Sequence, residues 1–175
     1  NMSWMIDPSH TRVQFSARHM MIATVRGEFK EFGGTVEFDE TKPEATKVAV
    51  EIKTGSVDSK DAKRDGHLVS PDFFDAAKFP VMSFKSKRVE NVKGERAKLI
   101  GDLTIKDVTH EVALDVEFHG LAKAPWGTTN AGFEAKGKLN RKDFGLVWNV
   151  ALETGGVLVG EDVNITIDAE IVKQA

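Results

Sequence analysis

No cysteine occurs among the 175 residues of the sequence, and this absence excludes several classes of protein together. Without a thiol there is no disulfide framework, no thiol nucleophile and no thiolate metal site. No apolar run approaches the roughly 20 residues that a membrane-spanning helix needs, so we expect no membrane-spanning segment. The 24 basic and 27 acidic residues are spread along the chain and leave a net charge of -3. Because no basic block could follow a phosphate backbone, we expect no nucleic-acid partner.

The short motifs of common enzymes are also missing. There is no His-x-His pair, no His-Glu-x-x-His, no Gly-x-Ser-x-Gly and no Gly-rich dinucleotide-binding turn. His110 and His119 are nine residues apart on one predicted strand, so their side chains point to opposite faces and cannot share a metal ion. We therefore predict a protein that is not an enzyme and that has no metal site and no cofactor.

Length and composition indicate one domain over residues 1–175. With 41% apolar and 29% charged residues and no low-complexity run, the chain has the composition of a soluble globular protein. Asn1 precedes Met2, which we interpret as the native start, and no charged segment followed by an apolar segment precedes the fold. The expected compartment is the cytoplasm, or the periplasm if a leader peptide precedes the sequence.

Alternating apolar and polar residues predict eight β-strands. The expected strands cover residues 12–18, 25–38, 47–53, 82–86, 97–105, 112–118, 131–139 and 163–171. Residues 19–24 break the alternation, and we expect one helical turn there. Gly33 and Gly34 lie inside the second strand, where a pair of glycines indicates a bulge or a sharp bend that lets the sheet curl.

Two long connections interrupt the strands. Residues 55–80 contain capping residues that predict a short helix over 56–64 and a second turn beginning at Ser70. This connection combines three Phe with a close grouping of Arg, Asp and His, and we expect it to lie across one end of whatever the strands enclose. The second connection, residues 140–160, is expected to be irregular.

Eight antiparallel strands with too little helix to cover a second face bury their apolar faces best by closing into a barrel. Such a barrel either fills with side chains or holds one small ligand. Small residues at inward positions favour a cavity, although they could instead pack against the eleven Phe. The small residues at these positions are Ala17, Gly101, Ala131, Ala135 and Gly137. Both outcomes stay open. The ligand of a cavity would be apolar and elongated, because few polar groups point inward.

Six short motifs follow one another along nearly the whole chain: Ile6-Asp7 with Ser9-His10, Val25-Arg26-Gly27-Glu28-Phe29, Arg64-Asp65-Gly66-His67-Leu68 with Phe73-Phe74-Asp75 and Phe79-Pro80, Gly101-Asp102-Leu103-Thr104-Ile105, Arg141-Lys142-Asp143-Phe144-Gly145, and Gly160-Glu161-Asp162-Val163. In these motifs the chain resembles the YceI-like family. The resemblance implies a lipocalin-like antiparallel β-barrel whose lumen binds a long isoprenoid lipid, such as a polyprenyl alcohol, a polyprenyl phosphate or an isoprenoid quinone. It also implies a homodimer.

We therefore predict an isoprenoid carrier, storage or transport protein whose lipid is a ligand and not a cofactor. The predicted ligand-binding residues are Phe15, Ala17, Phe29, Phe38, Val50, Ile52, His67, Leu68, Phe73, Phe84, Leu103, Leu114, Val116, Phe133, Arg141, Phe144 and Trp148. Two alternatives stay open. One is an enzyme that uses His67 and Asp65 on an isoprenoid or a lipid ester, and the other is a filled barrel that acts only as a dimerising module.

Two groups of charged residues have a second interpretation. Arg64, Asp65 and His67 either meet a polar head group at the mouth of the barrel or form a local ion pair and cap, and we favour the local role. Arg141 and Asp143 are expected to form a salt bridge that pins the second connection, in preference to ligand contact.

Overall fold

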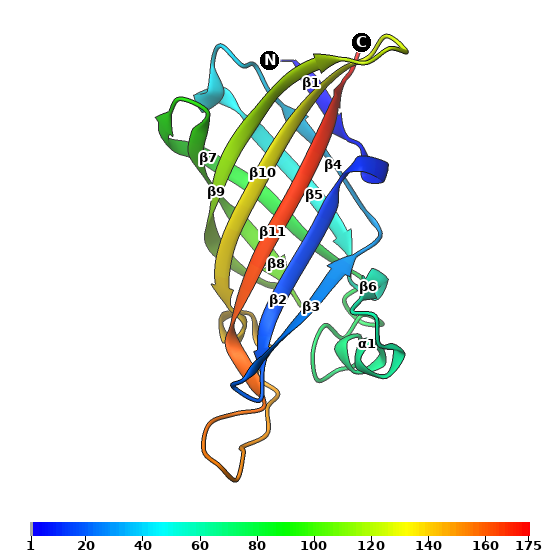
Figure 1. The fold of residues 1–175 in the computed structure, drawn as a ribbon, viewed down its shortest axis with the longest axis vertical. Coiled ribbons are helices and arrows are strands. Elements are labelled where there is room, and N and C mark those ends of the chain that lie inside the picture. Colours follow the sequence, from blue (N-terminus) through cyan, green and yellow to red (C-terminus); the bar gives the residue numbers. More distant parts are fainter. Residues whose placement is uncertain (1) are drawn as a thin grey trace.

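Long antiparallel strands curl into a closed eight-stranded barrel in the computed structural model, which describes residues 2–175 (Figure 1). The hydrogen-bonded segments are β1 (Ser3–Ile6), β2 (Arg12–His19), β3 (Ala23–Phe29), β4 (Phe32–Glu37), β5 (Lys47–Lys53), β6 (Val57–Asp58), β7 (Val81–Lys93), β8 (Arg96–Ile105), β9 (Val108–Lys123), β10 (Thr129–Asn140) and β11 (Val159–Lys173). The helical elements are α1 (Ala62–Leu68) and the 3₁₀ turns η1 (Pro8–His10), η2 (Pro43–Ala45), η3 (Thr54–Ser56) and η4 (Arg141–Phe144).

The barrel closes where β1 and β2, two parts of one interrupted strand, run along β11. β2 pairs with the first part of β11, and β1 pairs with Ile171, Val172 and Lys173 at its end. On their other side, β2 pairs with β3 and β1 pairs with β4. The ring of pairings is complete through β1, and the edges left outside it are those of β3, which pairs with β6 only at Glu28 and Phe29, and of β7 beyond Lys85. The eight-stranded antiparallel barrel predicted from the alternation is confirmed.

The N-terminal third of the chain departs from the predicted strands in three places. β1 was missed, since four residues are too few to reveal a period. Residues 25–38 are two strands, β3 and β4, and the chain bends at residues 30–31; the bend predicted at Gly33 and Gly34 is wrong, because β4 pairs with β5 in continuous register through both glycines. The helical turn predicted at residues 19–24 is also wrong, because the paired register of β2 and β3 leaves only a tight hairpin over residues 20–22.

The short helix in the first long connection begins later than predicted. Ser56 ends η3 and does not cap a helix, because Val57 and Asp58 pair with β3 as strand β6. α1 starts at Ala62, after Asp61, whose carboxylate accepts a hydrogen bond of 3.1 Å from the backbone N–H of Arg64. The turn predicted at Ser70 is present, with the N–H of Phe73 bonded to the Ser70 carbonyl at 3.0 Å.

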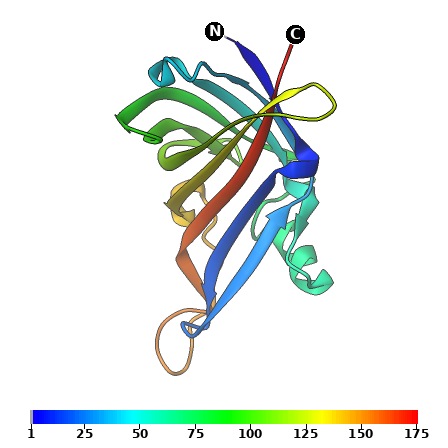
Figure 2. The same ribbon diagram turned by 45° about the horizontal axis from the view of Figure 1, so that its top comes forward.

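The two ends of the barrel differ (Figures 1 and 2). One end carries both long connections, residues 54–80 and 141–158, and we call it the connection end. The opposite end carries residues 38–46, the tight β7–β8 and β9–β10 hairpins and both chain termini, and we call it the hairpin end. The connection of residues 54–80 thus lies across one end of the barrel, as expected.

Buried side chains form two clusters. The larger one extends from the middle of the barrel to the connection end and includes Phe29, Phe73 and Phe144. The smaller one surrounds Trp4 at the hairpin end, where the indole N–H donates to the Phe38 carbonyl at 3.0 Å. Some small inward residues give room to large neighbours: a Cβ on Gly101 would lie 2.4 Å from Phe84 Cζ, and one on Gly137 would lie 2.6 Å from Leu114 Cδ2. At these positions small and large residues interlock.

Gly34 offers a test of how closely β4 approaches β5. A Cβ on Gly34 would lie 2.4 Å from the Ala49 carbonyl oxygen and 3.0 Å from Val50 Cα, and both atoms belong to the backbone. We expect Gly34→Ala to lower the free energy of unfolding by about 1–3 kcal/mol, because the strands must separate. Gly33→Ala is the matched control, since nothing lies within 4 Å of its Cβ. Urea denaturation monitored by tryptophan fluorescence compares the two, and equal midpoints would contradict the expectation.

Candidate functional site

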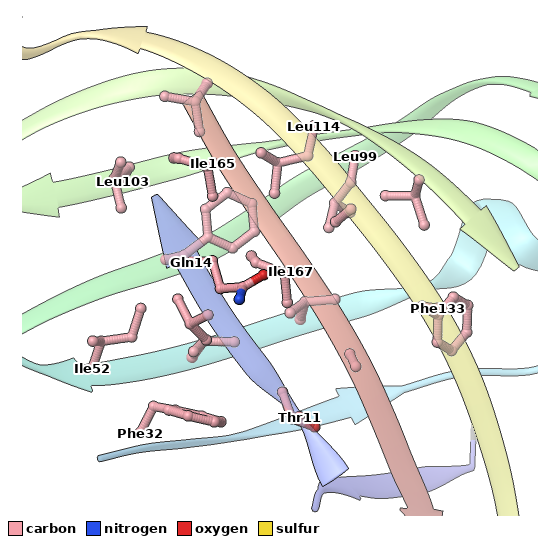
Figure 3. Close-up of a pocket in the computed structure, with 18 of the residues that line it drawn as sticks. Thr11, Gln14, Phe32, Ile52, Leu99, Leu103, Leu114, Phe133, Ile165 and Ile167 are labelled. Atoms are coloured by element: carbon pink, nitrogen blue, oxygen red, sulfur yellow. The ribbon is translucent and has the colours of Figure 1, made fainter. Parts of the chain in front are cut away.

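An apolar cavity of about 360 Å³ lies inside the barrel. Its lining comes from every long strand, because alternate residues point inward. On β11 the cavity is lined by Val159 and then by every second residue from 163 to 171, namely Val163, Ile165, Ile167, Ala169 and Ile171, and the residues between these alternate positions face outward. Figure 3 shows side chains from opposite walls converging on the same space, among them Leu99, Leu103, Leu114, Ile52 and Ile167.

The chemistry of this space favours an apolar occupant. Apart from Gln14 and Thr11, the side chains that line the space in Figure 3 are aliphatic or aromatic, so they offer water few hydrogen-bond partners. Transfer of apolar surface from water into such a space is favourable by about 25 cal/mol per Å². The cavity can therefore bind a molecule by its hydrocarbon portion without any specific polar contact.

The connection end of the cavity is covered. Leu68, Phe73 and Phe74 from the first long connection and Leu146 from the second line its floor. Phe74 packs edge-on against Phe29, with 5.5 Å between ring centroids. Because Phe73 and Leu146 are buried, this floor separates the cavity from solvent.

Arg141 holds the floor together. Arg141 is only 3% exposed, and its guanidinium donates to four backbone carbonyls: from Nε to Gly160 at 2.8 Å, from Nη1 to Leu146 at 2.6 Å and Trp148 at 3.0 Å, and from Nη2 to Val159 at 3.2 Å. Burial lowers the pKa of Arg141, and the carboxylate of Glu161 partly offsets this effect. The salt bridge predicted with Asp143 is absent, because the carbonyls of the second connection take its place.

The hairpin end of the cavity reaches solvent. Exposed residues of the loops and hairpin there belong to the lining, namely Glu40, Gly94, Glu95 and Arg96. The Arg96 guanidinium contacts the Glu117 carboxylate, so its charge is partnered. The rim is therefore polar, of mixed charge, and the mouth of the cavity is at this end.

All of the predicted ligand-binding residues line the cavity except His67, Phe144 and Trp148. Whether the lining residues contact a ligand stays a prediction. Phe144 is buried, and its ring lies 5.4 Å from that of His110. His67 and Trp148 pack on each other, with ring centroids 4.5 Å apart, and both contact Phe73. His67 lies on α1, Phe144 on η4 and Trp148 on the irregular chain that follows η4. These elements of the long connections are too short for a period to indicate which way a side chain points.

The grouping of Arg64, Asp65 and His67 does not form a site at the mouth. Asp65 Oδ1 accepts hydrogen bonds from the backbone N–H and the hydroxyl of Ser59, at 2.9 and 2.6 Å, and Arg64 donates to the same residue. His67 Nε2 lies 2.9 Å from Asp72 Oδ2. The geometry therefore favours the local role: hydrogen bonds of Arg64 and Asp65 to Ser59 fix the connection, and the acidic partner of His67 is Asp72 in the same connection.

The sequence reasoning missed the residues at the mouth. Register shifts between Ser86 and Arg88, and again between Glu90 and Lys93, change the phase of β7, so that Val89 and Val92 line the cavity. A bulge inserts one residue and moves every following side chain to the other face. No signal in the sequence marks these two bulges.

The chain is similar in sequence and in fold to proteins of one family. The model of the YceI-like domain matches residues 4–171. A UPF0312 protein of Staphylococcus aureus strain N315 is 39% identical over 166 residues, which is 94% of each chain. Among solved structures, the Campylobacter jejuni YCEI protein has a TM-score of 0.78 and 35% identity, and the match covers 90% of each chain.

A more distant structure shares the fold. It is a polyisoprenoid binding domain from Saccharophagus degradans, described as implicated in plant cell wall breakdown. The TM-score is 0.74 at 12% identity, with 99% of this chain and 100% of that domain covered.

Within residues 2–175, no helix is long and apolar enough to cross a membrane.

The contacts of Arg141 predict that its removal strongly destabilises the folded protein. Arg141→Ala removes a donor from each of four carbonyls, of which that of Val159 keeps the side-chain amide of Asn149, and we expect the free energy of unfolding to fall by at least about 2 kcal/mol. Amide hydrogen exchange should increase within residues 145–160. Lys142→Ala is the control: it breaks an exposed ion pair with Glu161, which is worth at most about 1 kcal/mol. If the two variants unfold at the same urea concentration, Arg141 does not hold the floor.

Proposed function

The chain belongs to the YceI-like family, and we propose that it binds a long-chain isoprenoid lipid in the barrel lumen and acts as a carrier, storage or transport protein. The observation that carries the proposal is the apolar cavity, which is covered at one end and has a polar rim at the other. A domain described as polyisoprenoid-binding has the same fold, which supports the choice of ligand class. The ligand would be a polyprenyl alcohol, a polyprenyl phosphate or an isoprenoid quinone.

The shape of the cavity favours entry of the tail first. The floor made by Phe73, Phe74 and Leu146 stops the tail at the connection end, and the head group then stays near the exposed rim. Most of the ligand surface that binding buries belongs to the tail, and burial of apolar surface stabilises the complex by about 25 cal/mol per Å². Because the rim carries Glu40 and Glu95 beside a partnered Arg96, we expect little selection for an anionic head group.

Binding without catalysis is the simpler function for this site. The enzyme alternative requires His67 and Asp65 beside the bound head group, but both lie at the connection end and outside the cavity lining, and each has another partner. The homodimer implied by the family is a separate prediction, which sedimentation equilibrium of the purified protein tests.

The direct test is to identify what the protein carries. We expect native mass spectrometry of the purified protein to show an added mass of one lipid per chain, and organic extraction to release an isoprenoid. Protein that has been stripped of lipid should take up an added polyprenol or quinone. An empty protein that takes up neither would argue for a barrel without a carrier function.

A substitution in the middle of the lumen tests where the lipid binds. Ala135 lines the cavity between Val116 and Ile167 on the neighbouring strands, and Lys136 is the next residue on the same strand, facing outward. We expect Ala135→Phe to reduce the affinity for the lipid by about tenfold or more, because the ring occupies space that the tail needs. Lys136→Phe adds the same side chain outside and should bind as the parent does. Equal binding by both variants, at equal thermal stability, would place the lipid elsewhere.

A further inference from the structure

The outer wall of the barrel carries a cluster of metal-ligand groups where the strand formed by β1 and β2 is interrupted. Asp7 caps η1 and His10 ends it, and Glu170 comes from β11. His10 Nδ1 lies 2.9 Å from Asp7 Oδ2 and 3.7 Å from Glu170 Oε2, and the three ligand atoms all lie within 4.8 Å of one another. Within residues 2–175 no other three His, Asp or Glu side chains meet in this way.

The backbone holds the two segments of this cluster in place without any ion. The N–H of Asp7 donates to the Glu170 carbonyl at 2.9 Å. The buried hydroxyl of Thr11 accepts from the Glu170 N–H at 3.1 Å and donates to the Glu170 carbonyl at 3.3 Å. The ligand atoms are therefore brought together by the closure of the barrel, and an ion would not have to order them.

Further hydrogen bonds orient the two carboxylates. The N–H and the hydroxyl of Ser9 donate to Asp7 Oδ1 at 3.0 and 2.7 Å, which leaves Oδ2 facing His10. The side-chain amide of Asn130 donates to Glu170 Oε2 at 3.0 Å. Outer hydrogen bonds of this kind fix the direction of ligands in metal sites.

We propose that Asp7, His10 and Glu170 bind a divalent transition-metal ion, of which Zn²⁺ is the representative. One imidazole nitrogen with two carboxylates is a donor set that Zn²⁺ accepts, with a water molecule completing the coordination. The side chains are between 22% and 59% exposed, so water can reach the ion. Ca²⁺ and Mg²⁺ prefer oxygen ligands alone and fit this set poorly.

The bound ion would join η1 to β11 across the line where the barrel closes. Because the folded chain brings these residues together and an unfolded chain does not, the ion stabilises the native state by mass action. Glu170 faces outward between Ala169 and Ile171, which line the lumen. The site is therefore separate from the lipid cavity, and it does not depend on the proposed function.

Titration with Zn²⁺ tests the site. Because the hydrogen bond to the Asp7 carboxylate raises the pKa of His10, the measurement is made at about pH 8, where protons compete less for the imidazole. We expect isothermal titration calorimetry to show one Zn²⁺ per chain and the melting temperature to rise with Zn²⁺ but not with Mg²⁺. His10→Ala and Glu170→Gln should each lower the affinity by at least about tenfold, and Asn130→Ala by about tenfold through the orientation of Glu170.

His119→Ala is the matched control. His119 Nε2 lies 3.3 Å from Glu117 Oε1 in a comparably exposed pair, but no third ligand from residues 2–175 adjoins it, so this variant should bind Zn²⁺ as the parent does. Circular dichroism establishes that each variant is folded. The proposal is overturned if the parent binds no Zn²⁺ at micromolar concentration, or if either His10→Ala or Glu170→Gln binds it with unchanged affinity.

Discussion

The ring of interstrand hydrogen bonds is the constraint on which the rest of this structure depends. A barrel pairs its backbone polar groups within the wall, so the interior needs no polar partners and can stay apolar. The ring closes only because β1 continues the line of β2 along β11 after the interruption at η1. The backbone bonds of Asp7 and Thr11 to Glu170 span that interruption, so they support both the wall and the cavity inside it.

The backbone polar groups at the two ends of the barrel find their hydrogen-bond partners in different ways. At the connection end, irregular backbone lies against the lumen and its carbonyls need donors. Arg141 supplies them, since one planar guanidinium can reach several carbonyls at once, whereas a lysine offers only a point charge. At the hairpin end the loops are exposed and solvent can satisfy their polar groups. The result is a cavity with an apolar floor and a polar mouth.

The sequence predicted the wall of the barrel well and its ends poorly. Alternation over many residues made the inward faces of β8 and β11 evident, including Leu103 on β8. It failed where the period is short or shifted, as in β1 and after the bulges that turn Val89 and Val92 inward. On irregular connections the direction of a side chain depends on distant contacts. Arg141 therefore binds carbonyls as far along the chain as Gly160, although Asp143 beside it looked like its partner.

The same alternation also separates what the inside and the outside of the wall can do. On β11, Ala169 and Ile171 face the lumen, whereas Glu170 between them faces η1. Sequence reasoning about paired histidines on one strand could not reveal a cluster at this point, because its members come from opposite ends of the chain and meet only when the barrel closes. A charged group on the outer face adds no polar surface to the cavity. One strand can therefore contribute to an apolar lumen and to a polar site on the surface, with neither weakening the other.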